Sequence, residues 1–207
     1  MQSDHLVLAL LWAAYCAVHS ALISTRVTNF FKRVLRAHYA FYRLFFNAFS
    51  LITFVPLLIY SRSQRYQDPM IFEWSGNWRI LQYLLIILAL VLVISGARHY
   101  SLSQFLGFRQ IRTRSSHGGM TETGNIDMTG VLGITRHPWY VAVFLLLWAN
   151  DLNIGTIVVN LVLSAYLVIG TLLEERKLVM EFGEEYRDYQ ARVSMFLPIK
   201  WLNPRQK

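Results

Sequence analysis

The hydrophobic and polar positions of this chain fall into long blocks, with apolar runs separated by short polar and basic stretches. A helix needs about 20 mostly apolar residues to cross the hydrocarbon core of a bilayer. Five runs are interpreted as spans of this kind: residues 5–24, 39–60, 80–97, 139–149 and 154–173. The pattern predicts an all-α integral membrane bundle of about five transmembrane helices.

The fourth run is the shortest, and the polar sequence Asn-Asp-Leu-Asn separates it from the fifth. These two runs are predicted to form a helical hairpin, whose first arm gains length from residues 135–138. The chain is then expected to be a single membrane domain over residues 1–207. Its parts are three N-terminal spans in 1–97, a cytoplasmic loop in 98–138, the hairpin in 139–173 and a cytoplasmic tail in 174–207.

Composition agrees with a membrane location. Of the 207 residues, 55% are hydrophobic and 15% charged, and the mean hydropathy of +0.35 is too high for a soluble domain with a wettable surface. Asp4 stands where a signal peptide carries a base, and the first run is too long for a signal sequence, so it is kept as a span. The single cysteine, Cys16, cannot form a disulfide within the chain.

Basic residues predict the orientation. They are frequent in the first and third loops and in the tail, whereas Asp68 and Glu73 dilute them after the second span and the hairpin turn has Asp151 and no base. The positive-inside rule then puts the N-terminus outside and the tail in the cytoplasm. Topology and anionic headgroups of membrane lipids account for the net charge of +8, so no nucleic-acid partner is expected.

The stretch between the third and fourth runs changes character along its length. Residues 99–112 are predicted to form a short amphipathic segment that lies along the membrane surface. Residues 115–130 are rich in Gly, Ser and Thr, and they are expected to be a mobile loop.

A polar pocket is predicted at the cytoplasmic mouth of the hairpin. The proline of the Arg-His-Pro sequence suits the first turn of a helix, so Arg136, His137 and Tyr140 line the start of the fourth span. The fifth span returns to the same side and ends at Glu174 and Glu175. Ionisable groups at membrane depth usually mark function. Spacing alone fits equally well with Arg136 as a topology anchor and the glutamates as part of a solvated charge run.

The same segments resemble a known family. Gly-Ile-Thr-Arg-His-Pro-Trp-Tyr at 133–140, Glu-Glu-Arg-Lys-Leu at 174–178 and Phe-Gly-Glu-Glu-Tyr-Arg-Asp-Tyr at 182–189 resemble the C-terminal half of the isoprenylcysteine carboxyl methyltransferase and phospholipid methyltransferase superfamily. The N-terminal half, including Tyr-Arg-Leu-Phe-Phe-Asn at 42–47, is similar to the bacterial branch that contains methanethiol S-methyltransferases and NnrU-like membrane proteins.

The resemblance implies methyl transfer from S-adenosyl-L-methionine to a small-molecule or lipid acceptor, which would be a thiol, a carboxylate or an amine. It implies a cofactor site lined by six residues: Gly133, His137, Pro138, Tyr140, Glu174 and Glu175. A carboxylate suits the cofactor's ammonium group or ribose hydroxyls, and Arg136 suits a bidentate pair with a cofactor or substrate carboxylate. Where phospholipid methyltransferases often have a Gly-x-Gly element, this chain has Gly130-Val-Leu-Gly133.

Catalytic roles are assigned to Arg136, His137 and His19, because a deprotonated acceptor needs a base or a stabilising cation. His19 is equally well interpreted as a helix-end residue that bonds a neighbour's carbonyl. No metal is expected, since the sequence has no His-Glu-x-x-His motif and only one cysteine. Tyr186 and Tyr189 are interpreted first as interfacial aromatics, and the resemblance gives them a role in covering the cofactor. The oligomeric state is not predicted.

Two other classes of function fit parts of the pattern. An NADPH-dependent sterol-type reductase would share the hairpin, but its Arg-Asp-Glu-like element is replaced here by Leu-Glu-Glu-Arg and the chain is short. A non-catalytic NnrU-like membrane protein would keep the same motif without turnover, because a fold does not fix a function.

Overall fold

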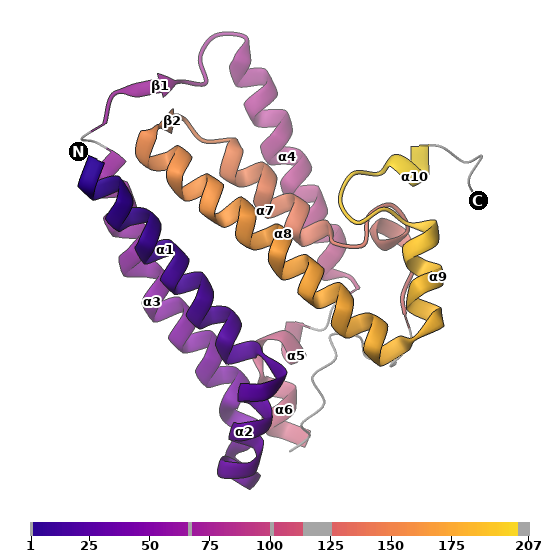
Figure 1. Ribbon diagram of the computed structural model, residues 1–207. Helices are drawn as coiled ribbons and strands as arrows, with labels where there is room; N and C mark the ends of the chain where they lie inside the picture. Colours follow the sequence, from indigo (N-terminus) through magenta and orange to yellow (C-terminus); the bar gives the residue numbers. More distant parts are fainter. Residues whose placement is uncertain (1, 66–67, 100–101, 114–125, 203–207) are drawn as a thin grey trace. The chain divides into compact units, whose positions relative to one another are not determined.

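The computed structural model describes residues 2–65, 68–99, 102–113 and 126–202, which are mostly helical (Figure 1). The prediction of an all-α membrane bundle is confirmed. The elements of the N-terminal half are α1 (Gln2–Ile23), α2 (Thr25–Leu35), the 3-10 helix η1 (Arg36–Phe41), α3 (Tyr42–Arg65), β1 (Met70–Phe72), α4 (Trp78–Ala97), α5 (Leu102–Leu106) and α6 (Phe108–Thr113). Those of the C-terminal half are η2 (Gly130–Gly133), α7 (Pro138–Trp148), β2 (Leu152–Asn153), α8 (Ile154–Phe182), α9 (Glu184–Arg192) and α10 (Ile199–Leu202).

Contacts divide the chain into two compact units. Unit 1 comprises Met1–Phe72, Ser101–Met120 and Leu152–Leu163, and unit 2 comprises Glu73–Tyr100, Thr121–Asp151 and Ser164–Lys207. The long helix α8 contributes its first turns to unit 1 and the rest to unit 2.

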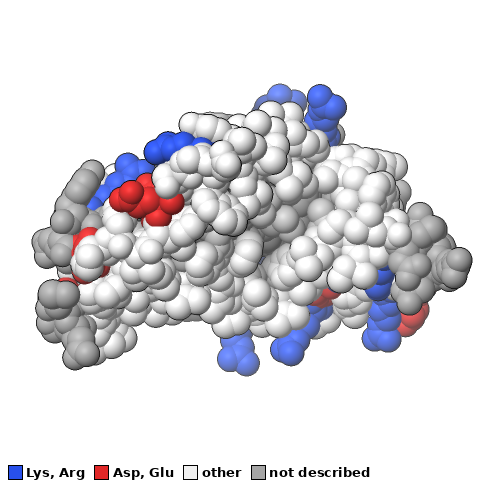
Figure 2. All heavy atoms as spheres, turned by 90° about the horizontal axis from the view of Figure 1, so that it is seen from above, with Lys and Arg blue, Asp and Glu red and all other residues white. Residues whose placement is uncertain are grey.

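Four helical stretches among the described residues are long and apolar enough to cross a membrane: Asp4–Ile23, Thr25–Ser63, Trp78–Ala97 and Ile154–Phe182. The fourth predicted span differs from the other four. It is the helix α7, whose 11 residues extend only about 16 Å, roughly half the hydrocarbon thickness. The face drawn in Figure 2 is largely uncharged, with Lys, Arg, Asp and Glu in a few groups near its margins.

In unit 1, α1 and α3 lie side by side and run antiparallel (Figure 1). Trp12 is 1% exposed, and its indole Nε1 donates to Ser61 Oγ at 2.8 Å. Large apolar side chains on the outward faces remain exposed, for example Leu10 at 60% and Ile52 at 69%. Such a surface is suited to contact with lipid rather than water.

The ends of unit 1 contain elements that the sequence did not predict. The segment expected as a basic loop forms α2, for which the Ser24 hydroxyl serves as the N-cap by accepting from Val27 N. The predicted amphipathic segment 99–112 becomes α5 and α6, which are separated at Gly107, where φ is +97°. At the opposite end, β1 pairs with β2 in an antiparallel ladder that sets Met70 opposite Asn153.

Asp68 joins three segments near those strands. Its Oδ2 contacts His5 Nε2 at 2.8 Å and accepts from Gly155 N at 3.0 Å, while its side chain is only 3% exposed. The carboxylate therefore connects α1, the segment after α3 and the first turn of α8.

In unit 2, α4 and α7 pack closely along their length (Figure 1). Ala89 and Ala142 are both fully buried, and small residues at such a contact let two helices approach closely. Trp139 Nε1 donates to Val93 O at 3.1 Å, and its ring lies over Gly96. This packing fixes α7 and the residues just before it.

The helix α8 continues past residue 173, where the fifth span was predicted to end, to Phe182. The glutamates at 174 and 175 consequently stand on the helix itself and not in a tail. Gly183, with φ of +60°, allows the turn into α9. Residues 115–125, which are most of the predicted mobile loop, lie outside the described residues, which resume at 126.

Candidate functional site

A short extended segment carries the first two side chains of the site. Thr135 pairs with Ser194 in an isolated parallel bridge, and Arg136 N donates to Ser194 O at 3.0 Å. His137 is the N-cap of α7 and Pro138 is its first residue, as predicted. The backbone of residues 135–137 is thereby held against the tail segment that follows α9.

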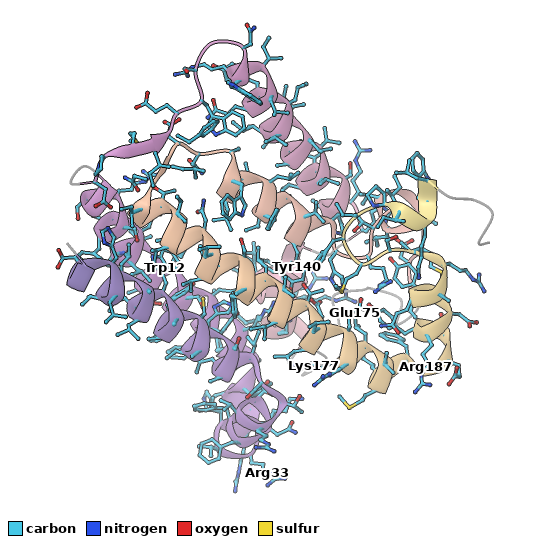
Figure 3. The ribbon with its side chains drawn as sticks, turned by 45° about the horizontal axis from the view of Figure 1, so that its top comes forward. Trp12, Arg33, Tyr140, Glu175, Lys177 and Arg187 are labelled. Atoms are coloured by element: carbon cyan, nitrogen blue, oxygen red, sulfur yellow. The ribbon has the colours of Figure 1, made fainter. Side chains whose placement is uncertain are left out.

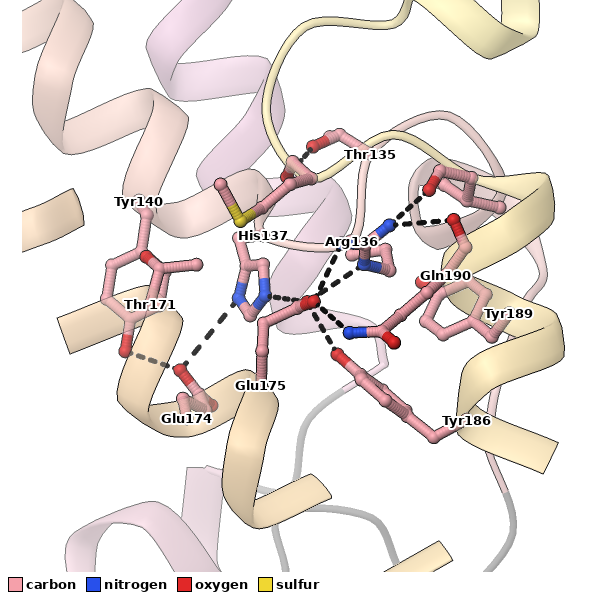
Figure 4. A network of polar contacts seen from close by, with 12 residues as sticks. Thr135, Arg136, His137, Tyr140, Thr171, Glu174, Glu175, Tyr186, Tyr189 and Gln190 are labelled. Carbon is pink, nitrogen blue, oxygen red and sulfur yellow. Dashed lines mark hydrogen bonds and ion pairs between the residues drawn. The ribbon is translucent and has the colours of Figure 1, made fainter. Parts of the chain in front are cut away.

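Glu175 is the centre of the polar network in Figure 4. Its Oε1 lies 2.8 Å from Arg136 Nε, His137 Nε2 and the Tyr186 hydroxyl, and its Oε2 lies 2.7 Å from Arg136 Nη2 and 2.5 Å from Gln190 Nε2. The side chain is 8% exposed. Because a carboxylate offers about four lone-pair sites, these contacts use its full accepting capacity.

The guanidinium of Arg136 is also committed within this network. In addition to its two bonds to Glu175, its Nη1 donates to the backbone carbonyls of Gln190 and Val193. Four of its five N–H groups are used, so one remains, whereas a bidentate grip on a ligand carboxylate needs two. Arg136 is 9% exposed, and it ties α8 to the end of α9.

Glu174 differs from its neighbour. Its side chain is 25% exposed, and its Oε2 accepts from the Tyr140 hydroxyl at 2.7 Å. The same Oε2 lies 3.8 Å from His137 Nδ1. Since Glu175 only accepts hydrogen bonds, Nε2 of His137 is assigned as a protonated nitrogen, and in the neutral imidazole the lone pair of Nδ1 then lies on the side of Glu174.

A core of aromatic residues supports the network. Tyr186 and Tyr189 are 3% and 4% exposed, and they form a buried cluster with Val193. The Tyr189 hydroxyl donates to Leu132 O at 2.7 Å, which connects α9 to η2. The interpretation of these tyrosines as interfacial aromatics is therefore wrong.

A third acidic side chain, that of Asp127, organises the residues just before η2. Asp127 Oδ1 accepts from Thr129 N and Oγ1, and its Oδ2 lies 2.6 Å from His99 Nδ1 at the end of α4. Partial burial opposes ionisation, but the hydrogen bonds from Thr129 and His99 outweigh it and lower the pKa of Asp127. The carboxylate thus connects the described part of this loop to α4.

Tyr186 gives a prediction for alkaline pH. Burial, followed by its hydrogen bond to the Glu175 carboxylate, raises the pKa of Tyr186 above its usual range. The protonated phenol therefore stabilises the fold fully below the unfolded-state pKa of about 10, and this stabilisation is lost as pH rises further. We expect the stability advantage of the wild type over Tyr186→Phe to be constant up to about pH 10 and to shrink above it. Chemical unfolding in detergent at a series of pH values measures it, and an advantage that grows above pH 10 would contradict the assignment.

The predicted site residues occupy several positions. Unit 2 brings together Arg136, His137, Tyr140, Glu174 and Glu175. Gly133 and Pro138, also predicted site residues, have structural contacts nearby. A Cβ at Gly133 would lie 2.9 Å from Met128 O, and the Pro138 ring faces Gly96.

His19 belongs to unit 1. Its Nδ1 lies 3.2 Å from Ser50 Oγ, and its ring packs against Phe46 at 4.8 Å between centroids. Among the described residues, no group of three or more His, Cys, Asp or Glu is arranged to hold a metal ion.

Sequence reasoning missed the contribution of α9. Tyr186 and Gln190 are four residues apart, so they share one face of the helix, and both reach Glu175. The spacing of Tyr186, Tyr189, Gln190 and Val193 was a signal for this face, because it repeats at helical period beside a polar surface.

The fold and the site define a membrane helical protein with a buried ionic network at the base of a helical hairpin, and comparisons with known proteins place it in a family. The NnrU protein family matches residues 7–197, and the chain belongs to it. The resemblance to the branch that contains NnrU-like proteins is thereby confirmed. No solved structure matches the chain.

Curated relatives match a shorter part of the chain. A methanethiol S-methyltransferase of Pseudomonas deceptionensis is 44% identical over 72 residues, which are 34% of this chain and 28% of the relative. Methanethiol S-methyltransferase 1 of Bradyrhizobium diazoefficiens is 41% identical over 64 residues, 30% of this chain and 22% of the relative. A methanethiol S-methyltransferase of Mycobacterium tuberculosis is 33% identical over 64 residues, 30% of this chain and 26% of the relative. The matched segments therefore span less than a third of these relatives.

Proposed function

We propose that this protein is a membrane-embedded methyltransferase that transfers a methyl group from S-adenosyl-L-methionine to a small thiol. The names of the relatives support the reaction class and the thiol acceptor. The observation that carries the proposal is the division of roles between two adjacent glutamates. Glu175 is saturated by protein donors, whereas Glu174 is partly exposed beside His137 and Tyr140.

The residues around Glu174 fit the amino-acid end of this cofactor. His137 Nδ1 and Glu174 Oε2 lie 3.8 Å apart. While Nδ1 is unprotonated, both atoms are hydrogen-bond acceptors, so neither can donate to the other. An ammonium group, or the two hydroxyls of a ribose, would supply a donor for each of these atoms. Within the described part of the chain, Oε1 of Glu174 accepts no hydrogen bond, so it is available to the same ligand.

The other residues of the network act as the frame. Glu175 and Arg136 hold the extended segment, α8 and α9 together, and Glu175 orients the imidazole of His137. Bound S-adenosyl-L-methionine supplies an electrophilic methyl group on a cationic sulfonium. Glu174 would hold the ammonium group or the ribose hydroxyls of that ligand, and the lone pair of a neutral His137 Nδ1 would be able to take a proton. Arg136 is assigned a positioning role.

The finer location is part of the same proposal. The four apolar helices support a membrane protein, and we propose the bacterial inner membrane with the N-terminus outside and the site facing the cytoplasm. The distribution of Lys and Arg over the loops supports this orientation.

One observation favours a second function, that of a non-catalytic membrane protein. The NnrU family match covers residues 7–197, whereas the methyltransferase relatives match about a third of the chain. A non-catalytic NnrU-family membrane protein would keep the network for folding and would not turn over substrate.

Binding and turnover of the detergent-purified protein distinguish the two. Isothermal titration with S-adenosylmethionine, S-adenosylhomocysteine and NADPH is followed by incubation with methanethiol and detection of dimethyl sulfide. Saturable binding of the first two ligands with dimethyl sulfide formation supports the proposal. A folded sample that binds neither S-adenosylmethionine nor S-adenosylhomocysteine overturns it in favour of the non-catalytic function.

The role of Glu174 is tested by Glu174→Gln. Loss of a charge-assisted contact of about 1.5–3 kcal/mol should weaken S-adenosylmethionine binding by roughly tenfold to a hundredfold. The midpoint of thermal unfolding should stay unchanged, because the side chain is partly exposed and its hydrogen-bond donor, Tyr140, can still donate to the amide oxygen. Glu184→Gln is the matched control, since that side chain is 84% exposed. Equal affinities for both variants would show that Glu174 does not contact the ligand.

A further inference from the structure

One end of unit 1 carries positive charge without acidic partners. Unit 1 contains only two acidic residues, Asp4 and Asp68, in its whole sequence. Both lie at the end where His5 contacts Asp68. Helix α1 is 22 residues long, or about 33 Å, and at its other end the Tyr42 hydroxyl bonds Leu22 O. The bases at that second end, on α2, η1 and the start of α3, are Arg26, Lys32, Arg33, Arg36 and Arg43.

Arg43 is the most enclosed of these bases. Its guanidinium carbon lies 5.7 Å from the centroid of Phe46 and 5.4 Å from that of Phe105, and its Nε donates to Phe105 O at 3.1 Å. Among the described residues, neither Nη nitrogen has a hydrogen-bond or ion-pair partner. The planar pair of Nη groups is thus held in place by aromatic rings and one backbone bond, with its donors available.

Tyr39 precedes Arg43 by four residues, and Lys32 lies over its ring. Lys32 Nζ lies 5.5 Å from the centroid of the Tyr39 ring, and it makes no hydrogen bond or ion pair with the described residues. Because of their spacing in the sequence, Tyr39 and Arg43 lie about one helical turn apart across η1 and the start of α3. Tyr39 therefore lies near two cations that have no ion-pair partner among the residues that the structure describes. The planar guanidinium of Arg43, the ammonium of Lys32 and the Tyr39 hydroxyl are together a set of hydrogen-bond donors that suits a phosphate.

The surface of α2 indicates that a phosphate bound here would belong to a membrane lipid. Phe30 and Val34 are 60% and 59% exposed on one side of the helix, and Arg26 and Arg33 lie next to them on the helical wheel. Arg33 projects away from the α1–α3 pair in Figure 3. A helix with exposed apolar residues bordered by bases lies in the headgroup layer of an anionic membrane.

We propose that Lys32, Tyr39 and Arg43 form a binding site for the phosphate of an anionic phospholipid, with the apolar side of α2 resting against its acyl chains. The site belongs to unit 1, and it is independent of the proposed methyl transfer. It gives the bases of α2 a specific ligand in addition to a general role in orientation.

The test is isothermal titration of the full chain, purified in non-ionic detergent, with dioctanoyl phosphatidylglycerol and dioctanoyl phosphatidylcholine. We expect tighter binding of phosphatidylglycerol. A basic residue near a lipid surface contributes about 1 kcal/mol, so Lys32→Gln should weaken it about fivefold. Arg43→Gln should weaken it about tenfold or more, because the fork is lost with the charge.

Controls distinguish this site from nonspecific attraction between basic residues and anionic lipid, and from a site for free phosphate. Arg62→Gln removes the same charge from an exposed position near the far end of α3, and it should change the affinity less than twofold. Lys32 makes no hydrogen bond to the described residues, so Lys32→Gln keeps the test valid even if Arg43→Gln disturbs α5. Equal losses for Lys32→Gln and Arg62→Gln, equal affinity for the two lipids, or full competition by equimolar inorganic phosphate would each overturn the proposal.

Discussion

Glu175→Gln is expected to destabilise the protein by about 3–5 kcal/mol, because it leaves the guanidinium of Arg136 buried without its counter-ion. The side chains of Arg136 and Glu175 are 7% and 8% exposed, so water cannot replace the lost charge. The amide also presents its NH2 group to donors that previously met a carboxylate oxygen. Chemical unfolding in detergent measures the loss, and S-adenosylmethionine binding should fall only as the folded fraction falls.

Two comparisons make that expectation specific. Glu184→Gln removes the same charge from a side chain that is 84% exposed, so it should leave stability unchanged within about 0.5 kcal/mol. The double variant Arg136→Met, Glu175→Leu removes both charges, and it should be more stable than Glu175→Gln. A double variant that is less stable than Glu175→Gln would show that the hydrogen bonds of the network, and not the unpaired charge, dominate.

Gly96→Val is expected to destabilise the contact between α4 and α7 by about 1–3 kcal/mol through overpacking. A Cβ at this position would lie 2.5 Å from Trp139 Nε1 and 2.7 Å from Trp139 Cδ1. The ring would have to move, and its hydrogen bond to Val93 O would be lost. Thermal unfolding in detergent measures the effect, together with the emission spectrum of the tryptophans.

Gly170 provides the matched control. It also lies inside a long apolar helix, but a Cβ there has no atom within 4 Å. Gly170→Val should therefore be neutral or slightly stabilising, because valine is a better helix former than glycine. Similar losses at both positions would mean that the general cost of a β-branched residue in these helices exceeds the cost of the contact with Trp139.

Hydrophobic blocks were sufficient to predict the long helices. The lipid-facing parts of α1, α3, α4 and α8 need apolar side chains over about 20 residues, and this requirement is written directly in the sequence. The motif at 136–140 and the glutamates at 174 and 175 were correctly brought together, because a hairpin returns its second arm to the level where the first began.

The parts that were not predicted depend on contacts between distant residues. Adjacent glutamates look equivalent in a sequence, but neighbouring residues of a helix point about 100° apart, so only one of them faces Arg136. The amphipathic ring of a tyrosine fits an interface or a polar core, and only the position of α9 decides between them. The strands β1 and β2 are too short to leave a periodic signal.

The contacts of Asp68 have a consequence for biosynthesis. This carboxylate is contacted by residue 5 and by residue 155, which are separated by most of the chain. During translation the pair α1–α3 is complete long before Gly155 leaves the ribosome, and domains form in the order in which their segments emerge. Until then Asp68 lacks its contact with Gly155, and this end of the α1–α3 pair becomes complete only when the first turn of α8 has formed.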